Sequence, residues 1–237
     1  MQRPLLALQN RLLVSLPADD FALLAPHLVA VELERGRLLY DPGDRIDTVY
    51  FPHDGVISMM TLMENGAAIE SATIGCEGAL GLHAAVTPRQ SLSRALVQTP
   101  VRASRISAAQ LHEVWQKSAR LRELVERHAE ALFGHALQSV ACNALHSVEA
   151  RFCRWLLTCH DRISSDTIAL TQEFLADMLG VQRTTVTAVA RSLQEKGAIR
   201  YRRGVVDIMD RPALETTACE CYGVIHRNYA RLLPNRG

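Results

Sequence analysis

The chain has 237 residues, of which 48% are hydrophobic and 22% are charged, and its formal net charge is +1. This composition is typical of a folded globular protein and excludes an intrinsically disordered chain. Apolar runs stay shorter than the ~18–20 residues that cross a bilayer, so we expect no membrane partner and a cytoplasmic location. The N-terminal segment, residues 1–20, predicts an amphipathic helix and lacks the pattern of a cleaved signal peptide.

Residues 5–28 predict one or two short helices, interrupted by Pro17 and Pro26. From residue 29 to residue 107, short runs rich in Val, Ile and Leu alternate with turn signals such as YDPGD, PHDG and MENG. Short strands bounded by such turns favour an all-β barrel or roll. The predicted strands cover residues 28–33, 48–51, 56–63, 67–74, 94–99 and 101–106.

Residues 108–145 predict one long helix, because apolar residues recur at intervals of about 3.6 and no proline interrupts them. A long helix that leaves a small barrel buries its apolar stripe against the barrel or in a coiled coil with a second copy of the chain. We therefore expect a homodimer, with a helix packed only inside its own domain as the alternative. Residues 146–162 predict a further helix, with Phe152 and Trp155 on its buried face.

Residues 170–204 predict two helices joined by a tight turn. Thr171 is a good N-cap for the first helix, and Gly180 ends it because glycine adopts the left-handed conformation of a tight turn. The second helix runs from about Gln182 to Lys196. In a helix-turn-helix, side chains at the start of the second helix meet base edges in the major groove. Arg183 occupies that position, and an arginine binds guanine through two hydrogen bonds.

The next residues, IRYRRGVVDIM, predict a β-hairpin that turns at Arg203-Gly204 and carries arginines close to phosphates. Residues 180–203 hold six basic side chains and one acidic, a net charge of +5, whereas residues 1–146 hold 13 basic and 15 acidic, a net charge of −2. This concentration of positive charge predicts double-stranded DNA as a partner. A helical hairpin with a solvated basic face is the alternative. The predicted DNA-binding residues are Thr171, Arg183, Thr184, Thr185, Thr187, Arg191, Arg200, Arg202 and Arg203.

This order of parts, a β-roll, a long helix, a short helix, a helix-turn-helix and a wing, resembles the Crp/Fnr family of bacterial transcription regulators. The resemblance covers about residues 10–210. It is strongest in LTQEFLADMLGVQRTTVTAVARSLQEKGAI, which looks like the DNA-binding signature of that family, roughly T-x-x-x-[IL]-A-x-x-[LV]-G-x-x-R-x-[ST]-[VI]. The residues that match the signature are Thr171, Leu175, Ala176, Leu179, Gly180, Arg183, Thr185 and Val186.

The resemblance implies an α+β fold in four parts. These are a jelly-roll-like β-roll sensor domain at residues 1–110, a long dimerisation helix at 111–145, a winged helix-turn-helix at 146–212 and a helical extension at 213–237. It also implies a homodimer that binds a palindromic DNA site and contacts RNA polymerase, without enzymatic activity. Arg183 matches the base-reading arginine of the family. Thr184 stands where many members have glutamate and Ala188 where some have a second arginine, so the preferred DNA sequence does not carry over.

Cyclic-nucleotide-binding members carry a phosphate cassette resembling G-E-x-[AG]-L … R-[ST]-A, in which a glutamate holds the ribose and an arginine pairs with the cyclic phosphate. The comparable stretch here is IGCEGALGLHAAVTPRQSLSRALV. Glu77 and Gly78 fit its first half, but Ser93-Arg94-Ala95 replaces Arg-Ser-Ala, and a shift of one residue reverses the face of a strand. The candidate effector-binding residues are therefore Glu77, Gly78 and Arg94, for a small molecule other than an ordinary cyclic nucleotide. A roll that binds no nucleotide is the alternative.

The six cysteines predict no disulfide framework in a reducing cytosol, and none of them forms the CxxC pair of a zinc ribbon. No cysteine precedes Cys76, which argues against the N-terminal iron–sulfur cluster of some family members. On one helical face, His135, Cys142 and His146 form a row that could hold a metal or haem, although buried cysteines are ordinarily small apolar residues. We predict no metal site and no cofactor, and the candidate redox residues are Cys142, Cys219 and Cys221.

The alternative function is that of a metal-dependent or ligand-binding, cupin-like β-roll protein with an incidental helical C-terminal domain. In that case His53, Glu77 and His83 are the candidate metal ligands. Their positions lack a metal-ligand spacing, so the sequence favours the regulator.

Overall fold

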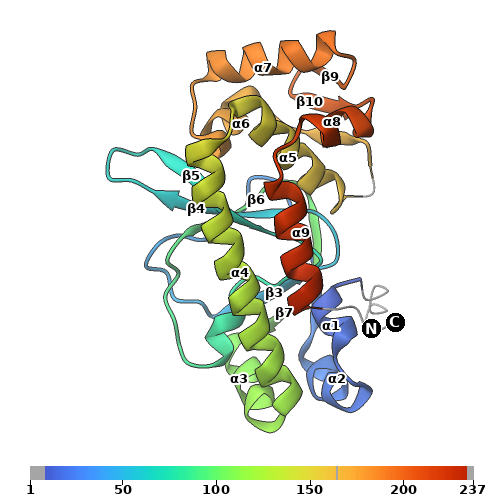
Figure 1. Cartoon of the computed structure of the whole chain (residues 1–237). Helices are drawn as coiled ribbons and strands as arrows, with labels where there is room; N and C mark the ends of the chain where they lie inside the picture. The colour runs from blue at the N-terminus through green and yellow to red at the C-terminus, as the bar shows by residue number, and fades with distance from the viewer. Residues whose placement is uncertain (1–8, 164, 234–237) are drawn as a thin grey trace.

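The computed structural model describes residues 9–163 and 165–233, and its N-terminal half contains two antiparallel sheets (Figure 1). One sheet has the order β1-β7-β3, from β1 (Val29–Leu33), β7 (Val101–Ser107) and β3 (Thr48–Pro52). The other has the order β2-β6-β4-β5, from β2 (Leu38–Tyr40), β6 (Arg94–Val97), β4 (Ile57–Leu62) and β5 (Ala68–Ile74). All six predicted strands are confirmed, and β2 is an additional strand too short to leave a periodic signal.

The two sheets close over a shared apolar core, as the alternating pattern of their strands requires. Leu33 and Ala103 enter this core from the first sheet, and Ile57, Ile74 and Val97 enter it from the second. The roll therefore has an apolar core between its two sheets.

Short helices before the roll agree with the sequence. α1 (Arg11–Ser15) and α2 (Ala18–Leu24) are separated by Pro17, and a 3₁₀ turn (Ala25–His27) follows. The predicted helix began at residue 5, and residues 5–8 lie outside the described part of the chain.

The predicted single helix over residues 108–145 is wrong in one respect, because it is two helices. α3 (Ala108–Lys117) ends at Ser118, whose backbone is extended, and α4 (Ala119–Leu145) begins directly after it. The Ser118 hydroxyl accepts a hydrogen bond from the Leu121 N–H and donates one to Asp20 of α2 at 2.5 Å. This N-cap ends the first helix and starts the second without a glycine or proline. α4 then runs alongside the roll and ends where the C-terminal half of the chain begins (Figure 1).

The C-terminal half contains the predicted winged helix-turn-helix. Its helices are α5 (Val148–His160), α6 (Gln172–Leu179) and α7 (Arg183–Glu195). The wing is β9 (Ile199–Arg202) and β10 (Val205–Ile208), and β8 (Thr167–Ala169) pairs with β10 as a third strand, in the order β8-β10-β9. The predicted caps are confirmed, since the Thr171 hydroxyl accepts from the Phe174 N–H and Gly180 has φ of 62°.

The helical extension implied for residues 213–237 is formed by two helices, α8 (Arg211–Thr217) and α9 (Cys221–Leu232). α8 packs on α5, and its Leu214 joins the core of the winged helix-turn-helix. α9 lies alongside α4 of its own chain, and Ile225 and Tyr229 join the core beneath α4 (Figure 1). Residues 234–237 of the predicted extension lie outside the described part. Within residues 9–163 and 165–233, no helix is long and apolar enough to span a membrane.

Candidate nucleic-acid interface and sensor cavity

A concave basic surface lies between the start of α7 and the wing. Arg183 is the first residue of α7, and its side chain lines a cleft of about 390 Å³ together with Arg202 and Arg203 of the wing. The remaining residues around this cleft are Thr171, Gln172, Tyr201 and Gly204. The predicted base-reading arginine and two predicted phosphate-binding arginines therefore meet in one place.

The wing owes its shape to a two-residue turn. Arg203 has φ of 50° and Gly204 has φ of 74°, which are the two left-handed residues of the turn that fits the twist of a hairpin. The register pairs Arg202 with Val205, so Arg202 and Arg203 are exposed at the tip. Arg200 lies farther back and pairs with Asp207 at 3.0 Å.

The other predicted DNA-binding residues lie on the outer face of α7. Thr184 is exposed, and Thr185 is half-buried. Arg191 is exposed and pairs with Glu195 one turn later, at 2.9 Å. The Thr187 hydroxyl donates to the Arg183 carbonyl at 3.0 Å and also contacts Gln172 Oε1 at 3.1 Å.

Gln172 joins this surface without having been among the predicted DNA-binding residues. Its side chain contacts Thr187 and also lines the basic cleft. It follows the Thr171 N-cap directly, and a polar side chain at the first position of the leading helix is the signal that points to it.

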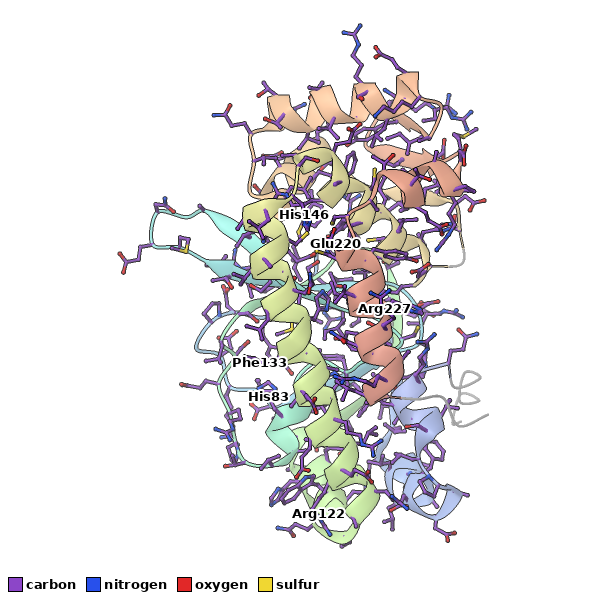
Figure 2. All side chains as sticks on the ribbon, in the orientation of Figure 1. His83, Arg122, Phe133, His146, Glu220 and Arg227 are labelled. Carbon is purple, nitrogen blue, oxygen red and sulfur yellow. The ribbon has the colours of Figure 1, made fainter. Side chains whose placement is uncertain are left out.

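A cavity of about 310 Å³ lies between the β-roll and α4. Its wall is mostly apolar, with Leu132 and Phe133 from α4 facing Ile46 and Leu80 of the roll. Figure 2 shows His83 and Phe133 on neighbouring parts of this region. Burial lowers the pKa of His128 to about 4, and burial also lowers the pKa of His83, so both histidines in the wall are neutral at pH 7.

The three candidate effector-binding residues do not converge on this cavity. Glu77 is buried in an ion pair with Arg162, at 2.5 Å from Nη2 to Oε1. Arg94 pairs with Asp41 through two hydrogen bonds of 2.9 Å. Gly78 lies against His128, where an added Cβ would come within 3.1 Å of Nε2. In this structure the two charged side chains already have protein partners.

The candidate redox cysteines, in contrast, are close together. Cys142 Sγ lies 3.5 Å from Cys219 Sγ, and Cys221 Sγ lies 3.5 Å from His146 Nδ1. A hydrogen bond from the Cys219 thiol lowers the pKa of Cys142, and the positive charge of Arg154 lowers it further. The predicted row is only partly formed, because His135 is buried against the ring of Tyr229.

Among the described residues, the candidate ligands of the cupin-like alternative do not form a cluster that could hold a metal ion. His53 Nε2 lies 2.9 Å from the Ser104 hydroxyl, and Glu77 pairs with Arg162. His83 lines the cavity between the roll and α4. These contacts disfavour the cupin-like alternative.

One face of α4 exposes an apolar stripe. Phe133 is 65% exposed, Leu137 is 55% exposed and Val140 is 69% exposed, at helical positions i, i+4 and i+7. Such spacing places the three side chains on one face, which is the pattern of a helix that packs against another helix. Phe133 also lines the cavity, so this face and the cavity share a residue.

Both halves of the chain match models of known protein families. A cyclic nucleotide-binding domain model matches residues 30–118, and a Crp-like helix-turn-helix domain model matches residues 150–217. The chain belongs to the Crp/Fnr family of DNA-binding transcription regulators. The global nitrogen regulator of Nostoc sp. (strain PCC 7120) is 23% identical to this Crp/Fnr regulator over 190 residues, covering 76% of this chain and 85% of the relative.

Solved structures with the same fold support the assignment of the Crp/Fnr fold. FixK2 from Bradyrhizobium japonicum has a TM-score of 0.68 at 15% identity, covering 81% of this chain and 98% of that one. TTHA1359, a Crp/Fnr-family regulator from Thermus thermophilus, has a TM-score of 0.64 at 21% identity, covering 80% of this chain and 98% of that one. At these identities the likeness concerns the fold alone.

Proposed function

We propose that this Crp/Fnr regulator acts in the cytoplasm as a homodimer that binds a palindromic DNA site and influences RNA polymerase there. The observation that carries the proposal is the basic cleft, in which Arg183 of α7 and the two wing-tip arginines surround one concave surface. A recognition helix in the major groove with a wing over the neighbouring backbone fits this arrangement.

Within each subunit, the roles follow from exposure and position. Arg183 reads a base edge, because it leads the recognition helix and is exposed. Arg202 and Arg203 bind phosphates from the wing tip, and Arg200 and Arg191 add positive charge behind them. The exposed hydroxyls of Thr171, Thr184 and Thr187, with the half-buried Thr185, contact the sugar–phosphate backbone or base edges at the helix ends.

The dimer forms through the apolar stripe Phe133–Leu137–Val140 of α4. Packing this stripe against the same stripe of a second subunit removes three exposed apolar side chains from water. A two-fold axis along α4 then sets the separation of the two recognition helices. Sites spaced by one turn of DNA, about 34 Å, are the geometric consequence.

The effector is an uncharged, largely apolar small molecule that enters the cavity between the roll and α4. Among the described residues that line this cavity, none is an arginine or a lysine, and both histidines are neutral at pH 7. A cyclic phosphate needs a charge-assisted partner that this wall does not supply. Because Phe133 belongs to both the cavity and the stripe, a bound effector alters the dimer interface directly.

The Arg183→Ala variant tests the proposal through competition for DNA. It is expected to cost about 1–3 kcal/mol at one base pair of the site and to relax specificity there. The matched control is Arg45→Ala, which removes an exposed positive charge from the roll, far from the cleft in sequence, and should leave the site preference unchanged. Equal weakening on all sequences would make Arg183 a phosphate contact and would contradict its proposed role.

A further inference from the structure

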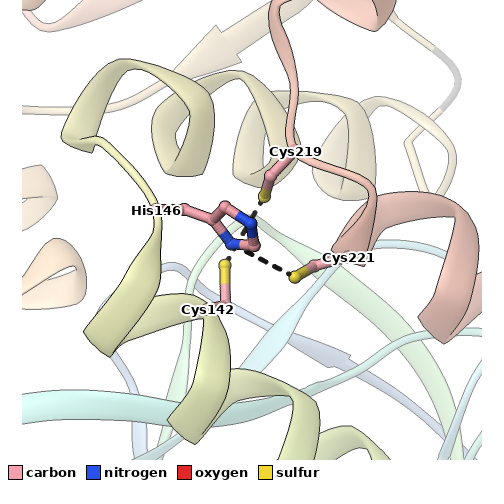
Figure 3. A group of neighbouring side chains, drawn as sticks. All are labelled: Cys142, His146, Cys219 and Cys221. Carbon is pink, nitrogen blue, oxygen red and sulfur yellow. Dashed lines mark hydrogen bonds between the residues drawn. The ribbon is translucent and has the colours of Figure 1, made fainter.

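Three cysteines and one histidine meet where α4 ends and α9 begins (Figure 3). Cys142 lies in the last turn of α4, and His146 is the C-cap of the same helix. Cys219 lies in the loop after α8, and Cys221 is the first residue of α9. The Sγ atoms and the nearest imidazole nitrogen all lie within 4.8 Å of one another.

Two of the separations between these atoms match those of one four-coordinate metal ion, and the others stay within 4.8 Å. The Cys142–Cys219 sulfur distance and the distance from Cys221 Sγ to His146 Nδ1 are both 3.5 Å. Tetrahedral Zn²⁺ with Zn–S of about 2.3 Å and Zn–N of about 2.0–2.1 Å places its ligand atoms roughly 3.5–3.8 Å apart. An iron–sulfur cluster inserts its own iron and sulfide atoms between the cysteines and needs a wider cage.

Polar side chains next to the cluster form hydrogen bonds to its histidine and to one of its cysteines. His146 presents Nδ1 to the sulfurs, while its Nε2 lies 3.2 Å and 3.1 Å from the two carboxylate oxygens of Glu220. Figure 2 shows His146 and Glu220 side by side where α4 ends. A carboxylate on the far nitrogen fixes the tautomer and orientation of a metal-binding histidine. Gln138 Nε2 donates a hydrogen bond to Cys221 Sγ at 3.0 Å.

Buried positive charge balances the thiolates. Arg151 and Arg154 of α5 are each 6% exposed, and both act electrostatically on Cys142. The Arg151 guanidinium donates hydrogen bonds to two neutral acceptors, Asn143 Oδ1 and the Leu179 carbonyl. Three thiolates around a divalent cation carry a net charge of −1, which a neighbouring guanidinium offsets.

We propose that Cys142, His146, Cys219 and Cys221 bind one Zn²⁺ ion that fastens α9 to the joint between α4 and α5. On binding, the three thiols lose their protons to solvent and form Zn–S bonds, and the neutral imidazole forms the Zn–N bond without any change of oxidation state. The site is closed by four protein ligands, as structural zinc sites are. α5 begins at Val148, two residues after His146, so the ion fixes the orientation of the DNA-binding domain on α4.

Metal content of the full-length, untagged protein tests the site. Protein refolded or dialysed with Zn²⁺ under reducing conditions should retain about one zinc per chain after removal of free metal, as four-ligand sites do. Cys142→Ser and Cys219→Ser should lose this zinc, whereas the control Cys76→Ser should keep it. Co²⁺ in the wild-type protein should give the visible absorption of tetrahedral thiolate coordination, which requires no folded variant.

A substitution of Glu220, which contacts His146 and is not itself a proposed ligand, should weaken zinc binding without abolishing it. Glu220→Gln should weaken zinc affinity by about 10–100-fold in competition with a chromophoric chelator. Zinc far below one per chain in the reduced wild-type protein, or equal zinc in the cysteine variants and the Cys76→Ser control, would overturn the proposal. A Cys142–Cys219 disulfide in the purified protein, followed by a failure to bind zinc once the disulfide is reduced and zinc is added, would also overturn the proposal. That result would favour a thiol switch.

The regulatory consequence rests on the proposed DNA-binding function, whereas the metal measurements do not. Removal of zinc should weaken binding to the palindrome, and its return should restore binding. If DNA affinity stays unchanged after zinc has been removed, the ion does not orient the DNA-binding domain on α4. That result would not contradict the metal site itself.

Discussion

The buried ion pair between Glu77 and Arg162 is expected to hold the DNA-binding half of the molecule onto the roll. Arg162 follows α5, and its guanidinium contacts Glu77 at 2.5 Å and 3.2 Å and Thr73 Oγ1 at 2.5 Å. The Arg162 side chain is only 7% exposed and the Glu77 side chain is only 10% exposed. Burial disfavours the charged form of Arg162, yet the negative charge of Glu77 keeps the pKa of Arg162 above its usual value.

Glu77→Gln should therefore destabilise the protein by about 3–5 kcal/mol. Opposite charges about 4 Å apart at an effective dielectric constant of 20 interact by roughly 4 kcal/mol, and the glutamine leaves the guanidinium buried without a counter-charge. Urea unfolding followed by tryptophan fluorescence measures the loss. The double variant Glu77→Gln/Arg162→Met should recover much of it, because neither charge then remains buried.

An exposed ion pair provides the control for this measurement. Arg45 and Asp47 lie 2.7 Å apart with side chains 72% and 67% exposed, so Asp47→Asn should cost below about 1 kcal/mol. A loss below about 1 kcal/mol for Glu77→Gln would refute the structural role of Glu77. A loss of effector binding with stability unchanged would return Glu77 to the effector-binding role that the sequence suggested.

Three further predictions concern the wing, the dimer and the cavity. Arg202→Ala should lower the slope of log affinity against log salt by about one unit without changing sequence preference, and an unchanged slope would remove the wing from the interface. Leu137→Glu should convert the proposed dimer to a monomer in analytical ultracentrifugation, because the glutamate would place a charge in the buried interface, and a persistent dimer would place the interface elsewhere. His128 accepts a hydrogen bond from the Ala79 N–H, and its pKa falls from 6.5 to about 4 on folding. Protonation then favours the unfolded chain, so stability should fall between pH 6.5 and pH 4 by about 3 kcal/mol from this residue. His128→Gln keeps an acceptor for Ala79 and should flatten this decline, and an identical decline in both proteins would contradict the burial of a neutral imidazole.

The helix-turn-helix could be predicted because its signals are local. Thr171 as N-cap, Gly180 at the turn and the apolar spacing that follows each act within a few residues, and the structure confirms all three. The wing turn at Arg203-Gly204 was predictable for the same reason.

The break at Ser118 could not be predicted because its cause is distant in the chain. The apolar period continues past this serine, and the hydroxyl is held by Asp20 of α2, 98 residues away. The position of α9 depends likewise on its packing with α4, since an amphipathic helix does not encode which surface it covers.

The sequence contains both halves of the cysteine cluster, but it does not show that they meet. Cys142 and His146 are one helical turn apart, and Cys219 and Cys221 form a C-x-C pair, which are the two halves of the proposed metal site. The two halves are 77 residues apart between Cys142 and Cys219, and only the return of α9 along α4 brings them together. The candidate effector-binding residues do not converge, because their side chains already have protein partners. Glu77 pairs with Arg162 and Arg94 pairs with Asp41, which a match to the phosphate cassette by sequence does not show.

Selection of binding sites from a random DNA library by the purified protein measures base recognition by α7 and the symmetry of the site in one experiment. We expect enrichment of an inverted repeat whose half-sites lie about 10–10.5 base pairs apart, and loss of that enrichment in the Arg183→Ala variant. Enrichment of a single unrepeated half-site would contradict the dimer, and equal recovery of all sequences would contradict recognition of bases by α7.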